Sequence, residues 1–274
     1  MSAAVWIDSH CHVSSADFDA DREAVIERAL ADGVELLIGI GSGYGIEQNL
    51  RAVELAGAHP RVYAAVGVHP HEAASLDDEG RRQLDGWLGR DRVVAVGECG
   101  LDYHYMRSPR DVQRSVFVEQ LATARARDLP VSLHVRGDQP NAYEELLEIW
   151  QSEGGGALEG VLHCYTGSLD FARRALDAGL YVSFSGILTF KRDRGLREVA
   201  KALPLDRLML ETDAPLLAPE GFRGRRNEPA RVALVGRVLA ETRGIPVEEV
   251  ARATTRNARR LFRLPETGPS AGRS

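Results

Sequence analysis

The chain alternates short apolar, β-branched runs with longer stretches in which apolar residues recur at helical spacing. The short runs are nearly continuous in apolar character, as expected for strands buried on both faces of a parallel sheet. Strands are predicted at Val5–Ile7, Glu35–Ile40, Val62–Val68, Val93–Gly97, Val131–Val135, Gly160–His163, Tyr181–Ser185 and Arg207–Leu210. Helices are predicted at Asp21–Ala31, Ile46–Ala58, Arg110–Arg127, Ala142–Gln151, Leu169–Ala178, Gly195–Leu203, Arg231–Arg243 and Val247–Phe262.

This alternation predicts an α/β protein built on a single (β/α)8 TIM-type barrel. Strands that alternate with helices form a parallel sheet, and eight strands close the common barrel, which needs about 250 residues. In the chain of 274 residues, the barrel domain is expected to span 1–263, with 264–274 as a disordered tail. The alternative is an open doubly wound sheet, whose first strand usually leads into a Gly-rich turn. Here residues 8–12 read Asp-Ser-His-Cys-His instead.

Composition and charge limit the possible partners. Apolar residues make up 44% of the chain and charged residues 27%, which is usual for a globular protein. The net charge of −6 argues against bulk attraction to DNA or to a membrane, so a polyanionic substrate needs a local basic patch or metal ions. Neither a signal-peptide pattern nor an apolar run of about 18 residues is present. We therefore expect a cytoplasmic protein without membrane contact, and a monomer.

Imidazole and carboxylate side chains follow the ends of five predicted strands. The candidate ligands are His10, His12, Glu98, His134, His163 and Asp213. Because the carboxyl ends of barrel strands form the face that carries the active site, these side chains are expected to converge there. His10 and His12 are two residues apart in an extended segment, so their side chains point the same way. Imidazole and carboxylate suit zinc, manganese or iron, whereas carboxylate with water suits magnesium. The pattern predicts a metal-dependent hydrolase.

The three cysteines each directly follow a candidate ligand. Cys11 follows His10, Cys99 follows Glu98, and Cys164 comes after His163. Neighbouring residues on a strand face opposite sides, so the thiols are predicted to pack outward against the helices rather than to bind metal.

Seven short motifs follow one another along the chain. They are Ile7-Asp-Ser-His-Cys-His12, Gly67-Val-His-Pro-His71, Gly97-Glu-Cys-Gly-Leu-Asp-Tyr103, Leu133-His-Val-Arg136, His163-Cys-Tyr-Thr-Gly167, Glu211-Thr-Asp-Ala-Pro215 and Arg223-Gly-Arg-Arg-Asn-Glu-Pro229. In type and order they resemble the motifs of the TatD family of metal-dependent deoxyribonucleases, which are amidohydrolase-like barrels. With the helix that ends near Phe262, the resemblance covers nearly the whole chain.

The resemblance implies a site for two divalent metal ions (Mg, Mn or Zn). His10, His12 and Asp213 would hold one ion and His134 and His163 the other, with Glu98 as the bridge. The implied activity is hydrolysis of DNA phosphodiesters, 3′-to-5′ on single strands. Two neighbouring ions can activate a shared water and neutralise the attacking and leaving oxygens.

Asp213 and Glu98 are the catalytic candidates at this two-ion site. Glu98 sets the spacing of the ions. Asp213 is expected both to bind metal and to accept the proton of the attacking water, and the alternative is that it is a ligand only.

Substrate contacts are predicted near the same strand ends, at Arg223, Arg226, Arg136, His69 and Tyr103. Guanidinium groups suit phosphate because their planar donors bind it bidentately. In the loop after the last strand we favour Arg223 and Arg226 over Arg225. His69 and Tyr103 can instead be neighbours of the ligands, and Asp102 can contact substrate or orient a ligand.

Two other functions fit parts of the pattern. The same barrel can hydrolyse an amide, ester or lactone, including the ester of an aminoacyl-tRNA, because fold does not determine reaction. A non-catalytic nucleic-acid-binding barrel is the rival from another class. The acidic chain and the lack of an evident aromatic stacking platform in the sequence argue against it.

Overall fold

The computed structural model describes residues 4–137, 141–154, 156–192 and 195–266. Eight parallel strands form one sheet in the order in which they occur along the chain. They are β1 (Trp6–Cys11), β2 (Val34–Ile40), β3 (Val62–Val66), β4 (Val93–Asp102), β5 (Val131–Arg136), β6 (Gly160–Leu162), β7 (Leu180–Phe184) and β8 (Leu208–Leu210). All eight coincide with predicted strands, although several boundaries differ by a few residues.

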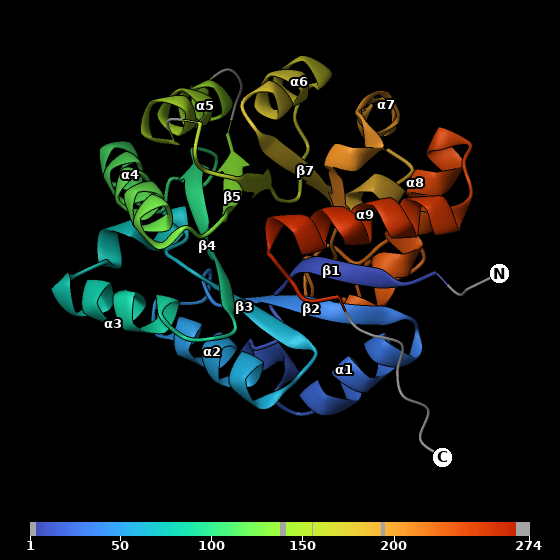
Figure 1. Cartoon of the computed structure of the whole chain (residues 1–274), viewed down its shortest axis with the longest axis horizontal. Coiled ribbons are helices and arrows are strands. Elements are labelled where there is room, and N and C mark those ends of the chain that lie inside the picture. The colour runs from blue at the N-terminus through green and yellow to red at the C-terminus, as the bar shows by residue number, and fades with distance from the viewer. Residues whose placement is uncertain (1–3, 138–140, 155, 193–194, 267–274) are drawn as a thin grey trace.

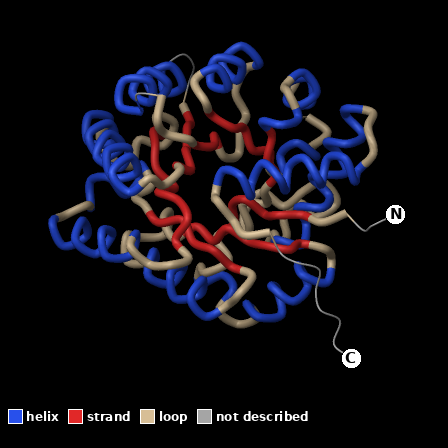
Figure 2. Tube along the Cα trace, in the orientation of Figure 1, coloured by secondary structure: helices blue, strands red, loops and turns tan. Residues whose placement is uncertain are grey.

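The sheet curves round until β8 returns to β1, which gives the predicted (β/α)8 barrel. Figure 2 shows the strands as an inner ring with the helices outside it. Backbone hydrogen bonds join the end of β1 and the residue after it to the segment that follows β8. The N–H of Asp213 donates to the carbonyl of His10 at 2.9 Å, and the N–H of His12 donates to that of Ala214 at 2.7 Å. Three predicted ligands, His10, His12 and Asp213, therefore lie where the barrel closes.

The outer layer consists of α1 (Arg22–Ala31), α2 (Gln48–Ala58), α3 (Asp78–Leu88), α4 (Arg110–Arg127), α5 (Asn141–Gly154), α6 (Leu169–Asp177), α7 (Leu196–Ala202), α8 (Val232–Arg243) and α9 (Val247–Leu261). Helix α3 was not predicted. Its segment contains two glycines and few apolar residues, so the helical pattern is weak. The Asp77 side chain caps it by accepting the Gly80 N–H at 2.8 Å, and Leu84 and Leu88 are buried. No helix in the described residues is long and apolar enough to cross a membrane.

Two apolar cores lie on either side of the sheet. The outer core fills the space between strands and helices. The inner core fills the barrel, where Ile7, Tyr181 and Met209 pack with Phe262 from the end of α9. Helix α9 contacts β1 and β8 and crosses the near opening of the barrel in Figure 1. Leu264, which we assigned to the tail, is only 7% exposed and belongs to the inner core; residues 267–274 of that predicted tail lie outside the described residues.

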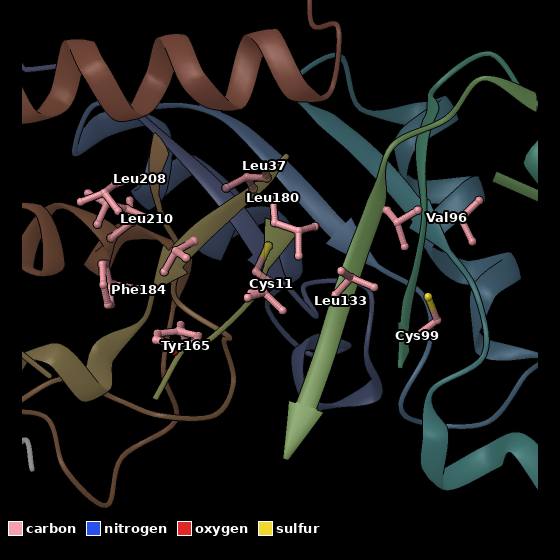
Figure 3. Close-up of a cluster of buried hydrophobic side chains, with 14 of the residues drawn as sticks. Cys11, Leu37, Val96, Cys99, Leu133, Tyr165, Leu180, Phe184, Leu208 and Leu210 are labelled. Atoms are coloured by element: carbon pink, nitrogen blue, oxygen red, sulfur yellow. The ribbon is translucent and has the colours of Figure 1, made fainter. Parts of the chain in front are cut away.

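The prediction for the cysteines is confirmed at two positions and wrong at the third. Cys11 and Cys99 are fully buried in the outer core (Figure 3). Cys164 is half-buried, and its Sγ lies 3.2 Å from Ser185 Oγ. Side chains alternate between the two faces of a sheet only within a strand. This rule does not apply to Cys164, because β6 ends at Leu162 and Cys164 has a positive φ of 45°.

Candidate metal centre

Glu98 lies at the centre of a cluster of histidines at the carboxyl ends of the strands. Its Oε2 lies 3.5 Å from His10 Nε2 and 4.0 Å from His12 Nε2. Its Oε1 lies 2.7 Å from His163 Nε2 and 2.9 Å from His134 Nδ1. The two oxygens of one carboxylate thus divide the four predicted histidines into two pairs.

Asp213 joins the first pair. Its Oδ1 lies 3.4 Å from His12 Nε2 and 3.7 Å from His10 Nε2. Asp213 has a positive φ of 56°, a sparsely populated conformation that often occurs at functional sites. The structure therefore brings together all six residues that the sequence singled out as ligands.

Two glycines allow β4 to run close to β5, which brings Glu98 near His134. A Cβ atom on Gly97 would lie 2.5 Å from the Ser132 carbonyl oxygen, and one on Gly100 would lie 2.0 Å from that of His134. Both glycines also have strongly positive φ angles, 139° and 138°, which side chains disfavour. A larger residue at either position would push the two strands apart.

In the second pair, His134 and His163, the ring nitrogens that point away from Glu98 each face a carboxylate. Asp102 Oδ2 lies 3.1 Å from His134 Nε2 and 2.9 Å from His71 Nε2. Glu211 Oε1 lies 3.2 Å from His163 Nδ1. Such partners orient a ligating imidazole and decide which nitrogen carries the proton. Asp102 was a candidate for this role. Glu211 was missed, although its spacing of two residues from Asp213 was a usable signal.

Neighbouring charges affect the pKa of Glu98 more strongly than its burial does. Burial raises the pKa of Glu98, but the neighbouring His163 and His69 bring that pKa well below its usual value. Burial likewise lowers the pKa of His163, but the charge of Glu98 and the hydrogen bond to Glu211 raise it well above the ordinary imidazole value. Without a metal ion, the centre thus favours a carboxylate beside a protonated His163, and a divalent cation can replace that proton.

The donor atoms suit a metal ion. His10 Nε2, which faces Glu98 and Asp213, and Glu211 Oε2 are buried, and neither has a hydrogen-bond partner among the described residues. Buried polar atoms normally have a partner. Ligands about 2.1 Å from a tetrahedral ion lie about 3.4 Å apart, close to the 3.4 and 3.7 Å that separate Asp213 Oδ1 from His12 Nε2 and His10 Nε2. The groups of ligand atoms that can hold an ion also include His69, with Glu98 and His134.

The predicted substrate contacts fall into two kinds. Arg136 is exposed, with its guanidinium 4.7 Å from the Tyr105 ring centroid, and the guanidinium of Arg223 is 3.8 Å from the Phe190 ring centroid. Neither guanidinium forms an ion pair among the described residues.

The other three predicted contacts already have partners within the protein. Arg226 forms a bidentate ion pair with Asp21, at 2.8 and 2.6 Å. The Tyr103 hydroxyl donates to Glu145 Oε2 at 2.6 Å. His69, the fifth, is buried, and its Nε2 lies 3.5 Å from Glu98 Oε1. It therefore lies within the metal centre rather than at its rim.

The barrel and the centre together define the class of metal-dependent barrel hydrolases. The family model described as TatD related DNase matches residues 7–263. The chain therefore belongs to the TatD family of metal-dependent hydrolases, as its motifs suggested.

Individual relatives match over nearly their full length. The uncharacterized metal-dependent hydrolase YabD of Bacillus subtilis (strain 168) is 41% identical, over 94% of this chain and 98% of the relative. TatD of Cronobacter sakazakii, named a 3′-5′ ssDNA/RNA exonuclease, is 36% identical over 93% of this chain and 97% of its own. The crystal structure of YjjV, a TatD homolog from Escherichia coli K12, superposes with a TM-score of 0.87 at 35% identity, covering 95% and 98% of the two chains.

Proposed function

We propose that this protein hydrolyses phosphodiester bonds of single-stranded DNA, removing nucleotides from the 3′ end, with two divalent ions (Mg, Mn or Zn) in its centre. The division of the two Glu98 oxygens between two pairs of histidines carries this proposal, because one carboxylate can then touch two ions. Relatives named 3′-5′ ssDNA/RNA exonucleases support the substrate and the direction.

Each ligand has a defined place in the proposed mechanism. His10, His12 and Asp213 would hold one ion, His134 and His163 would hold the other, and Glu98 would be shared between them. When bound, the ions supply the Lewis acidity that activates a water and neutralises charge on the phosphate. Asp213 directs Oδ1 at the histidines, and we assign its Oδ2 to accept the proton of the attacking water.

Two arginines are assigned to the phosphates of the substrate. Arg223 and Arg136 keep their guanidiniums out of ion pairs among the described residues, and planar guanidiniums can grip phosphate through two parallel hydrogen bonds. Local positive charge of this kind is needed because the chain as a whole carries a net charge of −6. Arg226 is no longer a strong candidate, because binding phosphate would require it to leave Asp21.

The test is cleavage of a 5′-labelled oligonucleotide, as a single strand and in a blunt duplex, with magnesium, manganese or zinc. We expect a ladder that shortens from the 3′ end of the single strand, abolished by chelator and by His10→Ala. His59→Ala is the matched control, because His59 ends helix α2 on the opposite side of the barrel from the centre. Metal-dependent cleavage of amides, esters or lactones without any release of nucleotides would overturn the proposal.

A further inference from the structure

The loop that follows β2 carries an exposed aromatic ring beside the metal centre. Tyr44 is 41% exposed, and its ring centroid lies 5.3 Å from that of His12, with an interplanar angle of 68°. In an edge-on contact of this kind, His12 leaves at least one face of the tyrosine ring uncovered. Among the described residues no hydrogen bond to its hydroxyl and no further ring contact is present. The sequence alone did not reveal this platform.

Hydrogen bonds on both sides of Tyr44 hold the loop in place. The carboxylate of Glu72 accepts the N–H of Gly43 at 3.3 Å and also the N–H of Gly45. Both glycines have positive φ angles, 95° and 107°, so the backbone can bend sharply around the tyrosine. At the start of the loop, Ser42 Oγ accepts the N–H of Glu98 at 2.9 Å. The ring is therefore fixed relative to the metal ligands before any substrate arrives.

A second exposed tyrosine, Tyr105, already contacts other side chains of the protein. Tyr105 is 50% exposed, but the guanidiniums of Arg136 and Arg107 lie 4.7 and 5.7 Å from its ring centroid. His71 also contacts it edge-on at 5.5 Å. Arginine side chains thus pack on its ring, whereas among the described residues no guanidinium lies over the ring of Tyr44.

We propose that Tyr44 stacks against the terminal nucleobase of the strand being cleaved and thereby selects unpaired ends. This inference rests on the proposed nuclease function. A base can stack on the ring only after it leaves its neighbours in the nucleic acid, which an unpaired end does readily and a duplex end does not. Stacking on an aromatic side chain tolerates any base, as an exonuclease requires. The position beside His12 places the ring next to the nucleotide whose phosphate meets the metal ligands.

The experiment uses two single-stranded oligonucleotides that differ only at the 3′-terminal nucleotide, which carries either a normal base or an abasic tetrahydrofuran. The rate of the first cleavage is measured for the wild type, Tyr44→Phe and Tyr44→Leu. We expect the wild type and Tyr44→Phe to favour the base-bearing end about tenfold, in line with the usual strength of base–aromatic stacking. Tyr44→Leu should cleave the base-bearing end about tenfold more slowly and the abasic end at the wild-type rate.

Two more variants test the environment of the ring. Glu72→Gln offers one carbonyl oxygen in place of two, so one glycine N–H loses its acceptor and the preference for a base should fall between those of the wild type and Tyr44→Leu. Leu50→Ala removes a similarly exposed apolar side chain on α2 and should leave the preference unchanged. Metal content, measured by elemental analysis, should be the same in all variants.

The following outcomes would contradict the inference. An equal loss on both ends with Tyr44→Leu, or an unchanged preference, overturns stacking. A Tyr44→Phe variant as slow as Tyr44→Leu would assign the effect to the hydroxyl and also overturn it. A wild type that cleaves both ends equally well refutes the role of Tyr44 while the nuclease function stands. A wild type that cleaves neither end refutes both.

Discussion

Replacing Asp102 with asparagine should weaken metal binding through the tautomer of His134. Asp102 Oδ1 accepts the backbone N–H groups of His104 and Tyr105, at 3.0 and 2.8 Å, and Oδ2 faces His134 Nε2 at 3.1 Å. Because Oδ2 accepts the Nε2 proton, the Nδ1 atom that faces Glu98 is left free to bind metal. Burial raises the pKa of Asp102, but the hydrogen bonds from His134 and His71 lower it well below its usual value.

In Asp102→Asn the side-chain oxygen should stay with the two backbone donors, since turning the amide round would leave both unpaired. The amide nitrogen then donates to His134 Nε2 and forces the proton onto Nδ1, which is the tautomer that cannot bind metal. Loss of such an outer partner typically costs 10–100-fold in metal affinity, or about 1.4–2.7 kcal/mol. The affinity is measured by titrating the metal-free protein with zinc or manganese in a calorimeter.

The matched control is Asp85→Asn, which changes an exposed aspartate paired with Arg127 on the outside of the barrel. We expect it to bind metal like the wild type. A metal affinity of Asp102→Asn within twofold of the wild type, with the fold intact by circular dichroism, would refute the tautomer argument. Loss of metal together with loss of the fold would instead make Asp102 a structural residue.

Three further predictions concern stability. Phe262→Ala removes a buried ring from the inner core and should lower the free energy of unfolding by about 3–5 kcal/mol; a change below about 1 kcal/mol in urea unfolding would contradict the place of Phe262 in that core. Burial raises the pKa of Glu145, but hydrogen bonds from Tyr103 and Arg110 bring it below its ordinary value. The stabilisation is therefore complete above the ordinary pKa of about 4.3 and is lost as the pH falls through the lower folded value. Glu145→Gln should lower the thermal midpoint most at pH 7 and progressively less below pH 4.3, and a pH-independent difference would refute this assignment. Chelator should lower the thermal midpoint of the wild type reversibly, since an ion at 100 times its dissociation constant stabilises by about 2.7 kcal/mol; an Asp213→Ala variant that responds as strongly would argue against its role as a ligand.

Local periodicity made the barrel and the position of its centre predictable. Strands buried on both faces are apolar throughout, so the polar residues that interrupt the pattern mark strand ends. In a parallel barrel those ends share one face. His10, Glu98, His134 and Asp213 could therefore be grouped from the sequence, although they lie far apart along it.

Helix α3 and Cys164 show where local patterns fail. The α3 segment is a weak helix by itself, and its helical structure depends on a cap and on burial against its neighbours. Tertiary packing often overrides intrinsic propensity in this way. Cys164 was misplaced because the strand ends two residues earlier than the alternation required.

The amino-acid sequence by itself determined the eight-fold alternation, the family and the set of six candidate ligands, because each follows from the order and spacing of residue types. Only the tertiary structure decided how the Glu98 oxygens divide the histidines and that Glu211 lies against His163. It also decided that Arg226 pairs with Asp21 and that Tyr44 is exposed beside His12. Asp21 and Arg226 are 205 positions apart, and such contacts depend on distances of a few ångströms between side chains. No periodicity along the chain encodes those distances.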